Sequence, residues 1–134
     1  MRAYAIFFPF LLGAAALPAK PSGLTVKPGE TWIFAIQKGQ PAKARRADVA
    51  KIPAPGEMKV SVRAMMGTSM SVTNHSRYDY AYRATLVLPD GKGGPVKSCA
   101  VPANGRTAFE HWTQAVTAVR LSDFKSAPAG SLCP

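Results

Sequence analysis

The chain has 134 residues, of which 47% are hydrophobic and 18% are charged, which is enough for one domain with a modest core. Seventeen Lys and Arg against seven Asp and Glu give a formal net charge of +10, and such a surface favours anionic partners such as nucleic acid, lipopolysaccharide or acidic lipids. The basic residues are scattered, with Arg45–Arg46 as the only adjacent pair, which argues against a dense nucleic-acid-binding arm.

The first residues, "MRAYAIFFPFLLGAAALPA", combine one cation, an apolar run and then small residues. This is the layout of a secretory signal peptide, so we expect residues 1–19 to be removed after Ala16 or Ala19. A membrane-spanning helix needs about 20 apolar residues, more than this run contains. The sequence therefore predicts a mature domain, residues 20–134, exported to the periplasm or secreted by a bacterium. An uncleaved membrane anchor is the alternative, and no transmembrane segment is expected after cleavage.

The first predicted strand lies in "ETWIFAIQ", with Trp32, Phe34 and Ile36 on one face. The basic, Pro- and Gly-punctuated residues 38–56 predict a loop that carries one short strand near Ala47–Ile52.

The clearest alternation of apolar and polar residues begins in "EMKVSVRAMM" and continues in "GTSMSVTNHS". It predicts either one long bent strand or a hairpin kinked at Gly67. The inward positions in these two runs are Met58, Val60, Val62, Ala64, Met66, Met70 and Val72. The "NHS" at 74–76 fits a glycosylation acceptor, but a turn is the simpler interpretation.

In "YDYAYRATLVL" the first three alternate positions are Tyr78, Tyr80 and Tyr82. The same face continues into Ala84, Leu86 and Leu88. Because a strand keeps its parity, we expect a core stripe with Tyr82 most buried, and Tyr78 able to reach solvent. A stacking platform for sugars or single-stranded nucleic acid is the less favoured alternative.

Strand patterns continue to residue 124. "PDGKGGP" predicts a hairpin turn, "VKSCAV" a strand containing Cys99, and "RTAFEHWTQ" and "AVTAVRLSDF" two further strands. A helical turn in "FEHWTQAVTAV" is the alternative for that segment. About seven short strands without a long amphipathic helix predict an all-β fold, a single β-sandwich.

An Asn-x-Ser turn, a "Y-x-Y-x-A-x-L" strand, a hairpin and a Cys-bearing strand together resemble small exported bacterial immunoglobulin-like domains. The resemblance covers residues 58–124 and implies an immunoglobulin-like sandwich. The Cys…Trp…Cys arrangement of true immunoglobulin domains is not matched, because Trp112 lies between the cysteines but Cys133 lies in a tail. No functional residue carries over.

The cysteines Cys99 and Cys133 predict one disulfide, because an even number of cysteines in an exported chain pairs in an oxidising compartment. Such a bond would tether the Pro- and Gly-rich C-terminal tail. A redox-active pair is disfavoured, because no C-x-x-C motif is present.

Soft thioether and imidazole groups raise the possibility of a copper site. The candidate ligands are Met65, Met66, Met70, His75 and His111. Methionines at inward strand positions, however, usually fill gaps in a core. Zinc is less favoured, because the chain has neither an H-x-x-x-H nor a C-x-x-C pair.

No G-x-S-x-G motif, phosphate-cradling Gly loop or Cys nucleophile appears. The sequence thus predicts an exported, non-enzymatic binding or structural module of the cell envelope, without a cofactor, whose partner is an unknown protein or an anionic envelope component. The candidate contact residues are Arg45, Arg46, Arg77, Tyr78 and Arg83. The alternatives are a periplasmic copper-binding protein and an enzyme that acts on an anionic envelope polymer.

Overall fold

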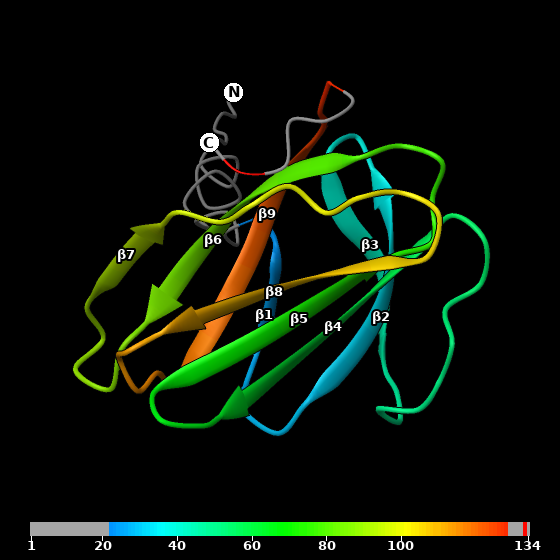
Figure 1. Cartoon of the computed structure of the whole chain (residues 1–134). Coiled ribbons are helices and arrows are strands. Elements are labelled where there is room, and N and C mark those ends of the chain that lie inside the picture. The colour runs from blue at the N-terminus through cyan, green and yellow to red at the C-terminus, as the bar shows by residue number, and fades with distance from the viewer. Residues whose placement is uncertain (1–21, 129–132, 134) are drawn as a thin grey trace, which may run out of the picture.

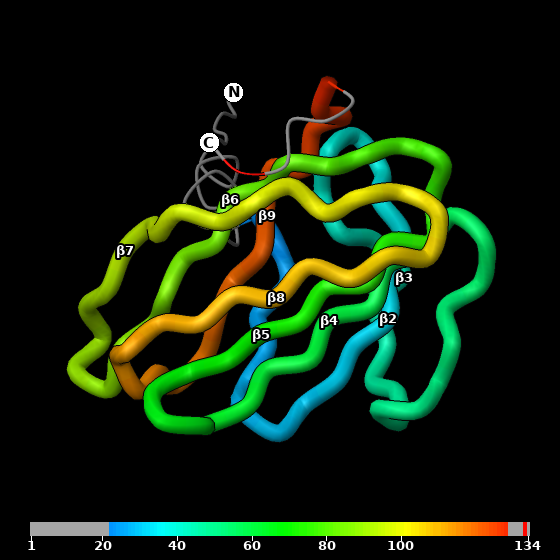
Figure 2. Tube along the Cα trace, in the orientation of Figure 1, coloured from blue at the N-terminus to red at the C-terminus, as the bar shows by residue number. Residues whose placement is uncertain are grey.

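The computed structural model describes residues 22–128 and Cys133, so the predicted signal peptide and its cleavage sites lie outside the described residues. The described part contains two antiparallel sheets that pack face to face (Figures 1 and 2). The four-stranded sheet has the order β1 (Leu24–Val26), β9 (Ala118–Ser126), β6 (Tyr80–Val87) and β7 (Gly93–Val96). The five-stranded sheet has the order β3 (Gln40–Arg46), β2 (Thr31–Gln37), β4 (Glu57–Ala64), β5 (Thr68–Asn74) and β8 (Arg106–Trp112).

The all-β prediction is confirmed, whereas the described residues form nine strands in place of about seven. Two of the additional strands, β1 and β7, have only three and four residues. Strands this short contain too few alternating positions to be recognised from sequence periodicity. Within residues 22–128 and Cys133, no helix has the length and hydrophobicity needed to cross a bilayer.

The core lies between the sheets and contains most of the residues that the alternation predicted, together with Leu24 and Val26 of β1 and Val101. Phe34 from β2 packs against Phe124 from β9, with ring centroids 5.6 Å apart. Phe124 also stacks on Tyr82, at 5.3 Å and an interplanar angle of 18°. The other fully buried core side chains include Met58, Val60, Val62, Met70, Val72, Ala84, Val119 and Leu121.

The tyrosine stripe belongs to this core, as predicted. Tyr82 is 9% exposed, and its burial raises the pKa of the phenol well above its ordinary value, with a further contribution from the charge of Glu110. Tyr80 is half-buried and contacts Phe124 edge-on. Tyr78 is 54% exposed at the end of the stripe. The rings therefore do not form a stacking platform.

The strand predicted near Ala47–Ile52 is wrong, because that segment is a loop and the strand is β3. A two-residue turn at Lys38 and Gly39, both with positive φ, reverses the chain after β2, so that Gln37 faces Gln40. β3 is an edge strand, where charged residues and Pro41 are tolerated because one side of the backbone is unpaired. Its composition therefore resembled that of a loop.

The two alternatives left open at Gly67 resolve into a hairpin between β4 and β5. Gly67 has φ +105°, and a Cβ atom there would collide with the carbonyl of Trp112, so only glycine fits. The predicted inward positions of Ala64 and Met66 are wrong, because Ala64 is exposed at the end of β4 and Met66 is part of the turn and is 92% exposed. The turn interrupts the parity of the strand.

The segment "VKSCAV" is not a strand as predicted, because β7 ends at Val96 and Cys99 lies in the connection to β8. After Val96 the chain leaves the four-stranded sheet and crosses to the other sheet. It stays in contact with β6 through the bridge between Val101 and Tyr80 and through the hydrogen bond from the Ser98 hydroxyl to the Tyr82 carbonyl at 3.2 Å. The helical alternative for the next segment is also wrong, since it contains β8. The predicted disulfide is confirmed, with the Cα atoms of Cys99 and Cys133 4.3 Å apart.

Candidate functional site

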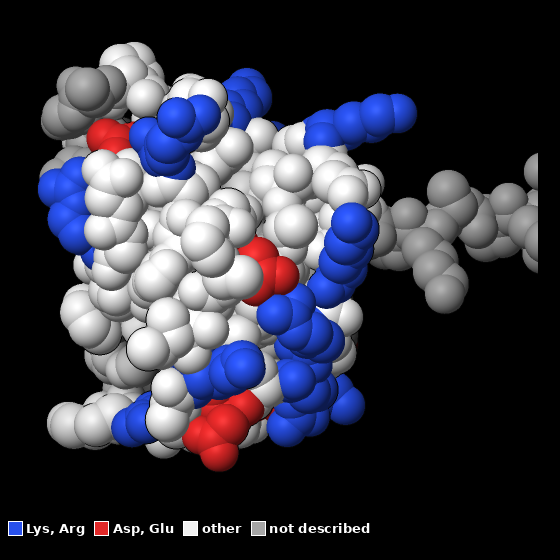
Figure 3. Space-filling model, turned by 90° about the vertical axis from the view of Figure 1, so that its right-hand side faces the viewer, with Lys and Arg blue, Asp and Glu red and all other residues white. Residues whose placement is uncertain are grey.

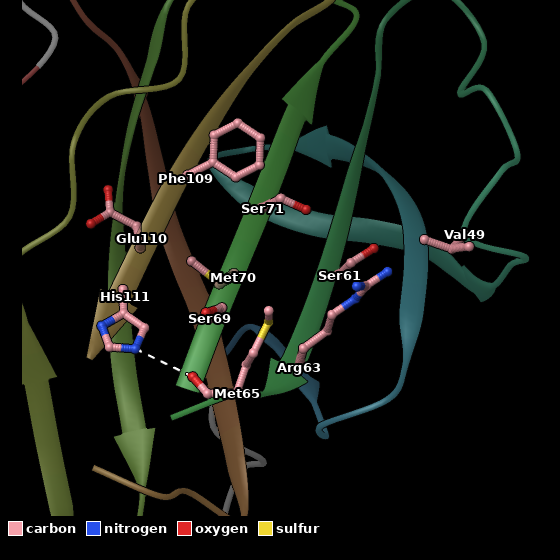
Figure 4. Close-up of a pocket in the computed structure, with 10 residues that line it drawn as sticks. All are labelled: Val49, Ser61, Arg63, Met65, Ser69, Met70, Ser71, Phe109, Glu110 and His111. Atoms are coloured by element: carbon pink, nitrogen blue, oxygen red, sulfur yellow. Dashed lines mark hydrogen bonds between the residues drawn. The ribbon is translucent and has the colours of Figure 1, made fainter. Parts of the chain in front are cut away.

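A groove of about 480 Å³ lies on the outer face of the five-stranded sheet, over β4, β5 and β8 (Figure 4). It is lined by Val49, Ser61, Arg63, Met65, Ser69, Met70, Ser71, Phe109, Glu110 and His111.

The floor of the groove follows from strand register. Ser61, Ser71 and Phe109 lie opposite one another on the three neighbouring strands. One step along, Arg63 and His111 flank Ser69 in the same way. Because alternate side chains point to the same side of a sheet, both rows face outward. The small serines leave a hollow beside Phe109 in the first row and between Arg63 and His111 in the second.

One wall of the groove is the loop between β3 and β4. The ammonium group of Lys59 holds it by donating hydrogen bonds to the carbonyls of Val49 (2.7 Å) and Lys51 (2.9 Å). Asp48 stabilises the same loop by accepting a hydrogen bond from the Ala50 N–H. These hydrogen bonds hold Val49 at a fixed place beside the serines.

The turn between β4 and β5 closes one end of the groove. The Nε2 atom of His111 lies 2.9 Å from the carbonyl oxygen of Met66 and 3.3 Å from that of Met65. These contacts hold the ring against the backbone of the turn (Figure 4).

Exposed apolar side chains gather at this groove. Among the described residues, six large apolar side chains are classed as exposed, and Phe109, at 77%, is the most exposed of those that line the groove. Val49 and Met65 also line it, and Met66 belongs to its closing turn. An exposed aromatic ring beside other apolar groups on a folded domain marks an interaction surface more often than isolated exposed residues do.

The acidic side chains all accept hydrogen bonds from groups within the protein. All seven lie in the described part of the chain, and each accepts a hydrogen bond from a neighbouring group within the protein. Glu110 accepts one from the Cys99 N–H at 2.7 Å. In contrast, Arg63 in the groove makes no ion pair with any described residue. The groove thus combines apolar groups with an uncompensated positive charge.

The predicted contact residues are not brought together. Arg45 pairs with Glu57 at 2.9 Å, and Arg46 pairs with Glu30 at 3.1 Å and lies 5.9 Å from the Trp32 ring. Arg45 and Arg46 are on β3, whereas Arg83 is on β6 in the other sheet, and Arg77 and Tyr78 are in the turn before β6. Figure 3 shows the face on the right-hand side of Figure 1, where Lys and Arg lie mostly around the margin with acidic groups among them.

The two acids that pair with the arginines of β3 have lowered pKa values. The hydrogen bonds from Arg45 and from the Ala54 N–H lower the pKa of Glu57. The pKa of Glu30 is lowered by hydrogen bonds from Trp32 and the Lys27 N–H. Both carboxylates therefore stay ionised and serve to fix the local backbone.

The candidate copper ligands are also separated. At the β4–β5 turn the His111 ring contacts the backbone carbonyls of Met65 and Met66, whereas Met70 is a core residue with 1% exposure. His75 lies beyond the opposite end of β5, near Gly105. Within residues 22–128 and Cys133, no three His, Cys, Asp or Glu side chains gather as a metal-binding group. Copper binding at the turn stays a prediction.

Sequence reasoning missed Arg63, Phe109 and the serines as site residues. Phe109 carried a signal, because it has the same parity as Thr107 and His111 and so occupies the polar face of its strand. An aromatic residue on an outward face is the pattern to look for.

The chain matches no protein-family model, no curated protein and no solved structure. The function is therefore argued from the chemistry of the groove.

Proposed function

We propose that the protein is an exported, non-enzymatic binding module that docks a protein segment in the groove over β4, β5 and β8. The observation that carries this proposal is Phe109, an exposed ring next to a hollow with a serine floor and an unpaired Arg63. Aromatic and arginine side chains dominate the binding energy of most protein interfaces.

The occupant we propose is a segment that presents apolar side chains and at least one Asp or Glu. Phe109, Val49 and Met65 offer apolar contacts, and Arg63 would pair with the acid. The carboxylate of Glu110 is already bonded to the Cys99 N–H, so no acid of the groove competes for Arg63. The hydroxyls of Ser69 and Ser71 can donate to backbone carbonyls of the segment, whereas that of Ser61 is hydrogen-bonded to the Thr31 hydroxyl at 2.8 Å.

Export and the immunoglobulin-like arrangement are part of the same proposal. The signal-peptide pattern in the sequence and the disulfide both suit an oxidising compartment such as the periplasm. Two antiparallel sheets made from about 100 residues suit an immunoglobulin-like domain.

The docking proposal is tested by panning a random peptide library on the purified protein. We expect enriched peptides to combine aromatic or aliphatic residues with Asp or Glu. Phe109→Ala and Arg63→Glu should each weaken a selected peptide at least about tenfold, because they remove an anchor and the charge partner. Arg83→Glu, on the other sheet, is the matched control and should bind normally. Peptides that bind all these variants equally would overturn the proposal.

A second candidate is a Cu(I) site at the β4–β5 turn, because the His111 ring contacts the backbone carbonyls of Met65 and Met66, whose thioethers belong to the same turn. If Nε2–H of His111 donates to the Met66 carbonyl, Nδ1 is left free as a ligand, the arrangement common in metal-binding histidines. Anaerobic titration of the purified protein with Cu(I) should show one tight equivalent that His111→Ala and Met65→Leu abolish and Met70→Leu retains. The absence of stoichiometric binding would exclude this site.

A further inference from the structure

The outer face of the four-stranded sheet carries four cations that the groove does not use. We name Arg83, Lys97, Arg120 and Lys125 the basic face. Arg83 lies opposite Ser122 and Arg120 opposite Thr85 on the paired strands β6 and β9. The two arginines are therefore diagonal neighbours, at a spacing that allows their side chains to reach the same ligand.

Two hollows on either side of Arg83 connect the members of the basic face. One, of about 320 Å³, is lined by Arg83, Arg120 and the hydroxyl residues Ser22, Thr85 and Ser122, with Pro95 and Asp123. The other, of about 370 Å³, includes Arg83, Lys97 and Lys125. Guanidinium groups beside hydroxyls are the groups that bind phosphate oxygens.

The positive charge of this face is only partly compensated. Asp123 is the acid that lines both hollows, and its carboxylate lies 3.4 Å from Nε of Arg83. The same carboxylate accepts hydrogen bonds from Gln40 (2.7 Å) and the Ser122 hydroxyl (3.3 Å). Lys97, Arg120 and Lys125 make no ion pair with any described residue. A net positive charge remains over β6, β9 and the end of β7.

The shape and composition of the face narrow the class of ligand. Its outward residues are Ala81, Arg83, Thr85, Val87, Pro95, Lys97, Arg120, Ser122 and Lys125. None is aromatic, so the face cannot stack the bases of a single strand. A four-stranded face is also too broad for the major groove of duplex DNA, which admits a helix or a two-stranded ribbon. A broad sheet face with dispersed cations fits a planar anionic surface.

From these observations we infer that the basic face binds the phosphate headgroups of an anionic lipid membrane. Among the described residues, no large apolar side chain is exposed on this face. The attachment is therefore electrostatic and reversible, and salt weakens it. The outer faces of the two sheets point in opposite directions, because the sheets pack against each other through their inner faces (Figure 1). Attachment through the basic face would thus point the groove away from the membrane. This inference does not depend on what occupies the groove.

Sedimentation with vesicles tests it, using the full processed protein and phosphatidylcholine vesicles with or without phosphatidylglycerol. We expect binding only to the vesicles with phosphatidylglycerol, with a steep loss in salt. Each cation removed near an anionic surface weakens partitioning about fivefold. Arg83→Gln/Arg120→Gln should therefore weaken partitioning about 25-fold, and Lys97→Gln/Lys125→Gln should do the same without touching the Asp123 contact.

The matched control is Arg63→Gln/Lys51→Gln, which lowers the net charge equally but alters the other side of the sandwich. It should retain nearly full vesicle binding. An equal loss in this control would show a general charge effect and overturn the inference. Free glycerol phosphate should compete weakly, because a single headgroup lacks the multivalency of a surface. Binding of soluble polyphosphate or duplex DNA at least as tight as vesicle binding, at equal phosphate concentration, would also overturn it.

Discussion

Replacing Asn74 with alanine is expected to lower the free energy of unfolding by about 3–5 kcal/mol. Asn74 ends β5 with 0% exposure. Its side-chain amide donates to the carbonyls of Tyr78 (2.7 Å) and Val101 (3.1 Å), and its oxygen accepts from the Ser76 N–H at 2.9 Å. Alanine would remove these three hydrogen bonds, at about 1 kcal/mol for each of the two to carbonyls, and would leave the Ser76 N–H without a partner at about 1–3 kcal/mol. The carbonyls of Tyr78 and Val101 keep their other donors, the Ser76 hydroxyl and the Tyr80 N–H.

Urea unfolding of the purified variants measures this effect. The matched control is Ser76→Ala, which also destroys the Asn-x-Ser sequence but removes only exposed hydrogen bonds with Tyr78. We expect it to cost less than about 1 kcal/mol. Similar small losses in both variants would contradict the role assigned to Asn74. The burial of Asn74 also argues against glycosylation at "NHS", because a buried amide cannot carry a glycan in the folded protein.

Replacing Cys133 with serine is expected to cost about 2–4 kcal/mol, the usual range for a native disulfide. The bond with Cys99 closes a segment with a sequence separation of 34. In the chain-entropy account, the bond stabilises the fold by restricting the unfolded chain. Cys99 is itself held by the hydrogen bond from its N–H to Glu110, so the cross-link joins the C-terminus to a fixed point near β8.

Thermal and urea unfolding of Cys133→Ser and of Cys99→Ala/Cys133→Ala separate the cross-link from side effects. Both variants should lose a similar free energy, because both lack the bond, and reductant should lower the wild-type value toward theirs. A wild-type protein whose unfolding does not respond to reductant, together with an unchanged Cys133→Ser, would contradict this prediction. Mass spectrometry with and without alkylation verifies that the wild-type thiols are paired.

Some site features follow directly from periodicity and some do not. The alternation in β4 and β5 correctly gave Met58, Val60, Val62, Met70 and Val72 as core. The same alternation placed Ser61, Ser69 and Ser71 on the outer face, but it could not show that three strands in register would make them the floor of one groove. Adjacency of β5 and β8 joins residues about 40 positions apart, and that depends on tertiary pairing.

The sequence by itself determined the all-β class, the core stripe of Tyr82, Ala84 and Leu86, and the pairing of the two cysteines. Each rests on a local period or on a count of two, which need no knowledge of neighbouring strands. Only the tertiary structure decided that β3 is an edge strand, that Met66 lies in a turn, and that Arg83 and Arg120 share a face. Those outcomes depend on register and sheet order, which long-range packing sets and local sequence does not encode.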